Sequence, residues 1–247
     1  MKRKIVITAD GSSTIHLPDW DEQYHSKHGA IQEANHVFIK HGLHYFCHLE
    51  GSRSANEESK CVTSSAVEKS QNISILEIGF GTGLNAIITL LEAEKLNVHI
   101  NYTGVEAYPV SSEEIAQLNY SDALQADNNL FDKLHETTWE TSHQITDKFT
   151  LTKQEKLFKD ISETNTFNLI YFDAFGARVQ PELWTETIFH KMYSALKING
   201  ILVTYSAKGS VRRAMQAVGF TVERLPGPPG KREMLRATKN IRQNGMS

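Results

Sequence analysis

The sequence has little cysteine and no long apolar segment. Only Cys47 and Cys61 occur among its 247 residues, which excludes a disulfide framework and fits a reducing cytoplasm. No apolar run approaches the roughly 20 residues that a membrane-spanning helix needs. The basic N-terminal residues precede an apolar stretch that is too short for a signal peptide. We therefore expect a soluble, cytoplasmic protein with no membrane partner and with enough chain for one substantial core.

Groups of metal ligands are also scarce. His41, His44, Cys47 and His48 lie close together in the sequence, but their spacings match no standard zinc pattern and no C-x-x-C motif occurs. Imidazoles on the surface or in the core explain them more simply. We expect no metal, and the sequence does not define a role for this cluster.

Charge is distributed unevenly along the chain. Residues 1–200 hold 17 Lys and Arg against 27 Asp and Glu, whereas residues 201–247 hold 9 against 2. The net charge is therefore −10 for residues 1–200 and +7 for residues 201–247. The basic C-terminal part indicates either a surface for a polyanion or a basic, frayed terminus. Charge alone does not choose between the two.

Strand and helix patterns alternate through most of the chain, which predicts an α/β fold with a mostly parallel, doubly wound sheet. A turn rich in Pro and Gly after residue 225 predicts an antiparallel closing hairpin. The expected strands cover residues 73–78, 98–105, 149–151, 167–172, 201–205 and 221–225.

The first 70 residues have a different character. A hairpin pattern over residues 4–17 is followed by a helical apolar spacing through Ala30, Ala34 and Phe38. The stretch from Gly51 to Asn72 is polar and reads as a flexible link. We therefore expect an N-terminal appendage over residues 1–70, packed on a main domain over residues 71–240.

The segment 75–85, ILEIGFGTGLN, joins an apolar strand to a helix through three alternate glycines. Glycines at such a junction allow unusual backbone dihedral angles and close approach of a ligand. The following helix points its free N–H groups toward the same place. A plain strand–helix turn would look similar, but the context favours a nucleotide-type cofactor site.

Two cofactors fit this loop. Gly81, Gly83 and Ala86 match the dinucleotide pattern G-x-G-x-x-G/A, as in an NAD(P)-binding or FAD-binding enzyme. Glu77, however, stands two residues before Gly79, and the resulting E-x-G-x-G-x-G resembles motif I of class I methyltransferases. A carboxylate there could reach the ammonium of S-adenosylmethionine but would repel a pyrophosphate, so S-adenosylmethionine is favoured.

Two further acids follow expected strands. Glu106 ends the second strand, where a carboxylate can accept hydrogen bonds from ribose hydroxyls. Asp173 ends the fourth strand within the aromatic segment YFDAFG, where it could hold an amine beside the reactive sulfonium. An exposed loop acid and a loop-capping aspartate are the respective alternatives.

Several C-terminal segments resemble one family. The segments 171–175 (YFDAF), 181–185 (PELWT), 209–213 (GSVRR) and 230–235 (GKREML) resemble motifs of the MnmC/MnmD tRNA methyltransferases, and the resemblance runs from about Trp20 to Arg236. It implies a Rossmann-like, S-adenosylmethionine-dependent enzyme. The implied reaction methylates the amine of 5-aminomethyl-(2-thio)uridine at the tRNA wobble position.

The resemblance also implies roles for residues. Asp173 would orient the amine and accept its proton, while Tyr24 and Phe175 would stack on a base flipped from the anticodon stem-loop. The implied cofactor residues are Glu77, Gly79, Phe80, Gly81, Thr82, Gly83, Asn85, Glu106, Gln154 and Glu155, and the implied tRNA-phosphate contacts are Lys208, Arg212, Arg213, Lys231 and Arg232.

Three departures from the family pattern are visible. Many relatives are fused to a flavin-dependent oxidase, an activity that we do not expect from these 247 residues. Gln154-Glu155 replaces a Gly-Asp pair near the adenine, and Ala174 and Gly176-Ala177 alter the pocket rim. A small-molecule amine methyltransferase and an NAD(P)-binding oxidoreductase stay open as alternatives, and a monomer is compatible with the sequence.

Overall fold

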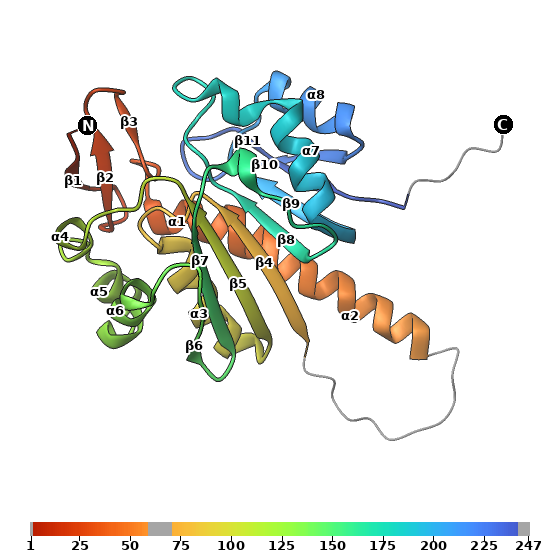
Figure 1. Cartoon of the computed structure of the whole chain (residues 1–247), viewed down its shortest axis with the longest axis horizontal. Helices are drawn as coiled ribbons and strands as arrows, with labels where there is room; N and C mark the ends of the chain where they lie inside the picture. The colour runs from red at the N-terminus through yellow and green to blue at the C-terminus, as the bar shows by residue number, and fades with distance from the viewer. Residues whose placement is uncertain (1, 59–70, 242–247) are drawn as a thin grey trace.

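The computed structural model describes residues 2–58 and 71–241 (Figure 1). Its centre is a sheet with the strand order β10-β11-β9-β8-β4-β5-β7-β6. The expected mostly parallel sheet with an antiparallel closing hairpin is confirmed. The parallel strands are β4 (Asn72–Ile78), β5 (His99–Glu106), β7 (Phe149–Glu155), β8 (Phe167–Phe172) and β9 (Leu196–Thr204); β6 (Ser142–Thr146) and β11 (Glu233–Thr238) run antiparallel to their neighbours, and β10 (Thr221–Pro226) pairs with β11.

Alternate side chains of the strands enter two separate cores. In β8, Leu169 and Tyr171 pack on one face of the sheet, while Ile170 and Phe172 pack on the other. Figure 1 shows helices on both faces, as a doubly wound sheet requires. The first core lies under η1 (Asn35–His44) and α3 (Leu84–Leu96), and the second lies under α7 (Glu186–Ala195) and α8 (Gly209–Val218).

The N-terminal residues form a small sheet and a long helical segment. The expected hairpin is present as β1 (Lys4–Ile7) and β2 (Ser13–Leu17), extended by β3 (Glu22–Gln23). The expected helix is also present, as α1 (Ala30–Ala34), the π-type helix η1 and α2 (Tyr45–Glu58) in succession. Gly42 of η1 lies close to the sheet, since a Cβ there would be 3.1 Å from Val203 Cγ2. This close approach makes η1 a cover of the sheet.

The flexible link expected from Gly51 onward is wrong for its first part. Helix α2 continues to Glu58, because good helix formers such as Arg, Ala and Glu prolong a helix that packing has already nucleated. The rest of the expected link, residues 59–70, lies outside the described residues.

The connection from β5 to β7 contains elements that the sequence patterns only partly reveal. The segment 111–114, SSEE, has the S-x-x-E pattern that predicts a capping box, and this box is present at the start of a short helix. Strand β6 has only one large apolar side chain, Ile145, so its alternation signal is weak. The elements here and in the next connections are α4 (Ser112–Ile115), α5 (Tyr120–Leu124), α6 (Asn128–Glu136), η2 (Phe158–Asp160) and η3 (Pro181–Trp184). Within residues 2–58 and 71–241, no helix combines the length and apolarity that crossing a membrane requires.

The strand order creates a crevice beside β4. Strand β5 lies on one side of β4 and β8 on the other, so the chain leaves these strands in opposite directions. The Asp173 N–H donates to the Ile78 carbonyl at 2.9 Å. Gly79 has φ 90° and a Cβ there would lie 2.8 Å from the Asp173 carbonyl oxygen, so only glycine fits. The fold therefore brings the glycine-rich loop and Asp173 together.

Gly104 of β5 provides a test of how the glycine-rich loop is supported. A Cβ at this position would lie 2.3 Å from the Phe80 ring, which is itself buried. We expect Gly104→Ala to lower the free energy of unfolding by about 1–3 kcal/mol, as overpacking of a core does. Urea denaturation measures this change. Gly51→Ala on α2 is the control: nothing lies within 4 Å of its Cβ position, and it should stabilise the helix. Unchanged stability of Gly104→Ala would contradict the packing described.

Candidate active site

A cavity of about 1400 Å³ opens at the carboxyl edge of the parallel strands. The glycine-rich loop, the residues after β5 and β8, and the N-terminal segment around β3 all contribute walls. Its volume accommodates a nucleoside cofactor together with a second substrate. Seven carboxylates line it against four cationic side chains, so it suits a positively charged ligand: Asp21, Glu22, Glu33, Glu106, Glu114, Asp173 and Glu182 against Arg3, Lys27, Lys159 and Lys231.

The N–H groups of the glycine-rich loop are largely occupied by the protein itself. Those of Gly79 and Phe80 donate to the Val105 carbonyl at 3.0 and 3.1 Å, and that of Gly81 donates to Glu106 Oε2 at 3.1 Å. A pyrophosphate needs such N–H groups free as an anion-binding nest. Together with the acidic cavity, this weighs against the NAD(P) interpretation.

Glu106 lines the cavity, and its carboxylate braces the loop. Besides Gly81, the Tyr108 N–H donates to it at 3.0 Å. Each oxygen thus accepts one backbone N–H and retains capacity for another hydrogen bond. The expected contact with ribose hydroxyls is compatible with this position and stays a prediction.

Glu77 lies behind the cavity rather than in its wall. Its side chain is fully buried, and burial raises its pKa well above the usual range. Asn85 stands in front of it, and its Nδ2 donates to Glu77 Oε1 and to Asp173 Oδ2, both at 2.8 Å. The direct contact of Glu77 with a methionine ammonium that the sequence suggested does not fit this placement. Glu77 instead holds Asn85, which holds Asp173.

Besides Glu77 and Asn85, four other expected cofactor residues lie off the cavity wall. Thr82 bonds to the Tyr120 hydroxyl at 3.0 Å, and Gly83 caps α3. Gln154 and Glu155 end β7, and the wall beyond them is built by residues 157–159, which the sequence analysis missed. The adenine contact expected at Gln154 and Glu155 therefore does not fit, because the chain continues past them before it reaches the cavity.

Asp173 lines the cavity at the end of β8. Burial raises its pKa to about 7, and the nearby negative charge of Glu33 adds to this, whereas the Asn85 hydrogen bond and the charge of Lys231 act in the opposite direction. A carboxylate that titrates near neutral pH can both accept and release a proton. This placement suits the role of proton acceptor that the sequence suggested.

Three aromatic side chains gather at the same cavity. Tyr24 and Phe175 lie with their ring centroids 4.9 Å apart, and Trp20, which the sequence analysis missed, lies 5.7 Å from Phe175. Arg178 donates to the carbonyls of Trp20 and Asp21 at 2.9 and 2.7 Å. This guanidinium therefore ties the N-terminal segment to the loop after β8, and the two expected base-stacking residues are brought together.

The expected tRNA-contacting residues divide into two groups. Lys208, Arg213 and Arg232 are exposed, and Arg212 is partly buried with its Nε unpaired among the described residues. Lys231 differs, because its ammonium pairs with Glu33 and lies 3.8 Å from the centre of the Tyr205 ring. Lys231 lines the cavity, so the phosphate contact expected for it does not fit its position.

Glu33 is a further residue that the sequence analysis missed. It lies on the buried face of α1 with Ala30 and Ala34, and only 6% of it is exposed. The sequence contains one signal for this residue, because Glu33 falls at an apolar position of the helical pattern. A carboxylate buried at such a position needs a partner.

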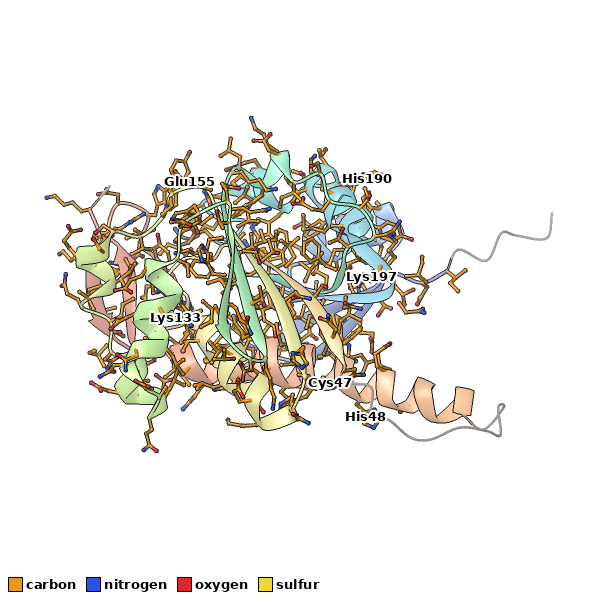
Figure 2. The ribbon with its side chains drawn as sticks, turned by 60° about the horizontal axis from the view of Figure 1, so that its bottom comes forward. Cys47, His48, Lys133, Glu155, His190 and Lys197 are labelled. Atoms are coloured by element: carbon orange, nitrogen blue, oxygen red, sulfur yellow. The ribbon has the colours of Figure 1, made fainter. Side chains whose placement is uncertain are left out.

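No metal site is apparent in the part of the chain that the structure describes, since no group of three or more His, Cys, Asp or Glu could hold an ion there. His44 Nε2 bonds to Glu92 Oε1 at 2.9 Å, and the His41 ring packs against His36. Figure 2 shows Cys47 and His48 on α2, far from Glu155 at the cavity end of β7. The histidine cluster therefore lies apart from the candidate site.

Comparisons with known proteins agree with this geometry. A family model described as "S-adenosyl-L-methionine-dependent methyltransferase" matches residues 118–240, about half of the chain. This segment belongs to that methyltransferase family. The matched segment includes Asp173 and the closing hairpin. The match confirms the expected cofactor, S-adenosylmethionine. The acidic cavity and the occupied loop N–H groups fit such a cationic, phosphate-free cofactor.

The methyltransferase also resembles longer proteins. It is 28% identical, over 93% of its length, to the "tRNA 5-methylaminomethyl-2-thiouridine biosynthesis bifunctional protein MnmC" of Cupriavidus metallidurans. A protein of the same description from Hydrogenovibrio crunogenus is 26% identical over 87% of the chain. The matches cover 33% and 31% of those proteins, so the chain spans about a third of the curated relatives' length. The crystal structure of MNMC2 from Aquifex aeolicus, at 23% identity, matches with a TM-score of 0.73 over 97% of this chain and 71% of that one, which supports the fold.

The raised pKa of Asp173 predicts how stability depends on pH. The folded-state pKa of about 7 lies above the unfolded value of about 3.9, so the native state retains a proton that the unfolded chain releases. This contribution to stability is lost as pH rises between those values. Asp173→Asn cannot ionise, so relative to the parent it should gain about 4 kcal/mol of stability by pH 8, at about 1.4 kcal/mol for each unit of the pKa difference. Urea unfolding at about pH 4 and pH 8 checks this, with the exposed Asp132→Asn as control. A constant difference between parent and Asp173→Asn would contradict it.

Proposed function

We propose that this methyltransferase transfers a methyl group from S-adenosylmethionine to the amine of 5-aminomethyl-(2-thio)uridine at the wobble position of tRNA, giving 5-methylaminomethyl-(2-thio)uridine. The observation that carries the proposal is that Asp173 and the aromatic side chains of Tyr24 and Phe175 line the same cavity as the glycine-rich loop. One wall can thus hold the cofactor while another holds a base and its amine. The description of the relatives, which concerns the same nucleoside, supports this substrate.

The chemistry requires a neutral amine. An alkylammonium has a pKa of roughly 10, near that of lysine, so it is mostly protonated at neutral pH. S-adenosylmethionine, when bound, supplies a methyl group on a positively charged sulfur. Asp173 accepts the proton of the amine, and Asn85 fixes the direction of the Asp173 carboxylate. Tyr24 and Phe175 stack on the flipped uridine and align its amine with the methyl group.

The exposed basic residues supply the surface for the anticodon stem-loop. Lys208 and Arg213 lie at the start of α8, which follows β9. Arg232 directly precedes β11, and the pairing of Leu235 with Thr204 brings it to the same carboxyl edge of the sheet as the cavity mouth. Phosphate contacts there hold the tRNA while one base enters the cavity, and such a substrate places the enzyme in the cytoplasm.

Methylation of tRNA that carries 5-aminomethyluridine tests the proposal, with nucleosides analysed by mass spectrometry. Asp173→Asn should lower the rate by about 100-fold, the range for loss of an acid–base group. Its affinity for S-adenosylmethionine, measured by calorimetry, should stay within a few-fold. Higher pH should partly restore the rate, because solvent then supplies the neutral amine. Near-normal turnover would refute the role of Asp173, and methylation of small amines but not tRNA would favour a small-molecule methyltransferase.

The basic surface gives a separate prediction. In the triple variant Lys208→Ala/Arg213→Ala/Arg232→Ala, tRNA binding should weaken and its salt dependence should flatten by about one slope unit per lost phosphate contact. Affinity for S-adenosylmethionine should not change, because none of the three residues lines the cavity.

The matched control removes three lysines near the amino edge of the sheet. Lys148 precedes β7, Lys95 lies in the last turn of α3, and Lys133 of α6 bonds to the Ile145 carbonyl near that edge (Figure 2). The variant Lys95→Ala/Lys133→Ala/Lys148→Ala loses the same charge but should bind tRNA with nearly the parent's salt dependence. Equal losses in both variants would show that net charge, not this surface, governs binding.

A further inference from the structure

An ion pair inside the cavity joins two distant parts of the chain. Lys231, in the loop between β10 and β11, pairs with Glu33 of α1, and the side chains are 32% and 9% exposed. The Ser26 N–H donates to the other Glu33 oxygen at 2.9 Å. The Lys231 ammonium also lies over the Tyr205 ring, and the Tyr205 hydroxyl donates to the Ala174 carbonyl at 2.8 Å. Both charges are thus held in defined positions.

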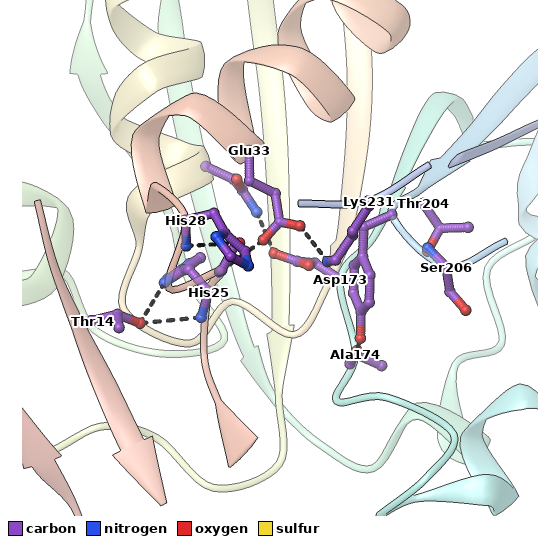
Figure 3. A network of polar contacts seen from close by, with 12 residues as sticks. Thr14, His25, His28, Glu33, Asp173, Ala174, Thr204, Ser206 and Lys231 are labelled. Atoms are coloured by element: carbon purple, nitrogen blue, oxygen red, sulfur yellow. Dashed lines mark hydrogen bonds and ion pairs between the residues drawn. The ribbon is translucent and has the colours of Figure 1, made fainter. Parts of the chain in front are cut away.

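The pair lies beside Asp173. Figure 3 shows Glu33, Lys231 and Asp173 converging, with Ala174 next to them. Burial raises the pKa of Asp173 most. Glu33 raises it further and Lys231 lowers it, and the influence of Glu33 is the larger of the two. The two partners therefore act on the same carboxylate in opposite directions.

We propose that Glu33 and Lys231 are positioning residues that act through Asp173: Glu33 keeps this carboxylate able to take up a proton near neutral pH, and Lys231 limits how tightly the proton is then held. The inference rests on the proposed function only in naming an amine as the source of the proton.

Several other ionisable groups around the pair are neutral or paired at neutral pH. Burial lowers the pKa of His25 to about 4 and raises that of Glu77. Burial also raises the pKa of each neighbouring tyrosine, namely Tyr102, Tyr120 and Tyr205. Glu22 forms an ion pair with Arg178 at 3.1 Å. Glu33 and Lys231 are consequently the two charged side chains that modify the proton affinity that burial and the Asn85 hydrogen bond give to Asp173.

The proposed step balances as follows. The Asp173 carboxylate takes one proton from the substrate ammonium, which frees the nitrogen lone pair. The nitrogen then forms a bond to the methyl carbon while the carbon–sulfur bond breaks and its electron pair stays on sulfur. The methylated amine leaves as an ammonium, and Asp173 returns its proton to solvent. Without Glu33 the carboxylate would be a weaker base, with only burial raising its pKa, and without Lys231 the neighbouring carboxylate of Glu33 would make it hold the proton more tightly.

Titration of the unliganded full chain tests the inference without any activity. The aspartate carboxyl carbons are labelled with ¹³C for NMR, and Asp173→Asn identifies the Asp173 signal. Glu33→Gln should move its titration midpoint down by about one pH unit, and Lys231→Met should move it up by about as much. Lys231→Arg keeps the charge and should restore the parent value. Shifts in the same direction, or none, would overturn the inference.

A second cavity-lining ion pair provides the matched control. Arg3 and Glu114 pair at 2.9 Å, and neither contributes to the proton affinity of Asp173. Glu114→Gln and Arg3→Met should leave the midpoint in place, whereas shifts as large as those of the test variants would overturn the inference. If Glu33→Gln or Lys231→Met does not fold, the exchanged pair Glu33→Lys/Lys231→Glu retains both charges. It should lower the midpoint, because the more influential position then carries a positive charge, and a raised midpoint would overturn the inference.

The pH–rate profile separates this inference from the proposed function. With 5-aminomethyluridine tRNA, the acid limb should move down in Glu33→Gln and up in Lys231→Met, in step with the titration. If the parent methylates no such tRNA, the proposed function fails while the titration still reports on the pair. If the parent is active but the acid limbs of Glu33→Gln and Lys231→Met do not move in opposite directions, the inference fails and the proposed function is unaffected.

Discussion

One amide group links the buried Glu77 to Asp173 in the cavity wall, and the site depends on this link. Asn85 Nδ2 donates a hydrogen to Glu77 and a hydrogen to Asp173, each at 2.8 Å. The Asn85 bond is the larger of the two hydrogen bonds, from Asn85 and Tyr102, that offset the burial of Glu77. The glycine-rich loop, the start of α3 and the end of β8 are consequently fixed relative to one another. The direction of the Asp173 carboxylate at the end of β8 therefore follows from a residue in the first turn of helix α3.

The N-terminal segment is as important to the cavity as the sheet. The α/β core supplies the glycine-rich loop, Glu106 and Asp173, but Tyr24, Trp20 and Glu33 come from the segment that precedes β4. Arg178 and Lys231 join that segment to the loop after β8 and to the closing hairpin. The proposed cofactor side of the cavity is thus built by the α/β core, and the opposite wall is where substrate selectivity can be built.

Local patterns predicted what depends on local physics. The order of strands and helices, the capping box at Ser111 and the glycine-rich junction all follow from periodicity or backbone demands over a few residues. Asp173 could be placed because ligands bind beyond the carboxyl ends of parallel strands. The base-stacking role shared by Tyr24 and Phe175 was implied by the family resemblance, and no local pattern predicted that the two rings lie together.

Long-range contacts account for what the sequence did not reveal. Glu77 was expected in the cavity, but whether a strand-end side chain faces solvent or Asn85 depends on the packing of α3. Lys231 looked like one more basic surface residue, because its partner Glu33 is 198 positions away. Residues 157–159, and not Gln154 and Glu155, form this part of the cavity wall, because the short helix η2 follows β7. A single turn of helix leaves almost no periodic signal in a sequence, so this element was not predicted.

The same separation in sequence affects how the chain folds during synthesis. Besides the Glu33–Lys231 pair, His36 Nε2 contacts the Pro226 carbonyl at 2.8 Å, and His28 lies against Gly230. Contacts between residues so far apart form late, since the entropy of closing a large loop opposes them. On the ribosome, α1 emerges long before the hairpin of β10 and β11 exists. Until then its buried acid has no counter-charge, and the nascent domain has a sheet but no finished pocket.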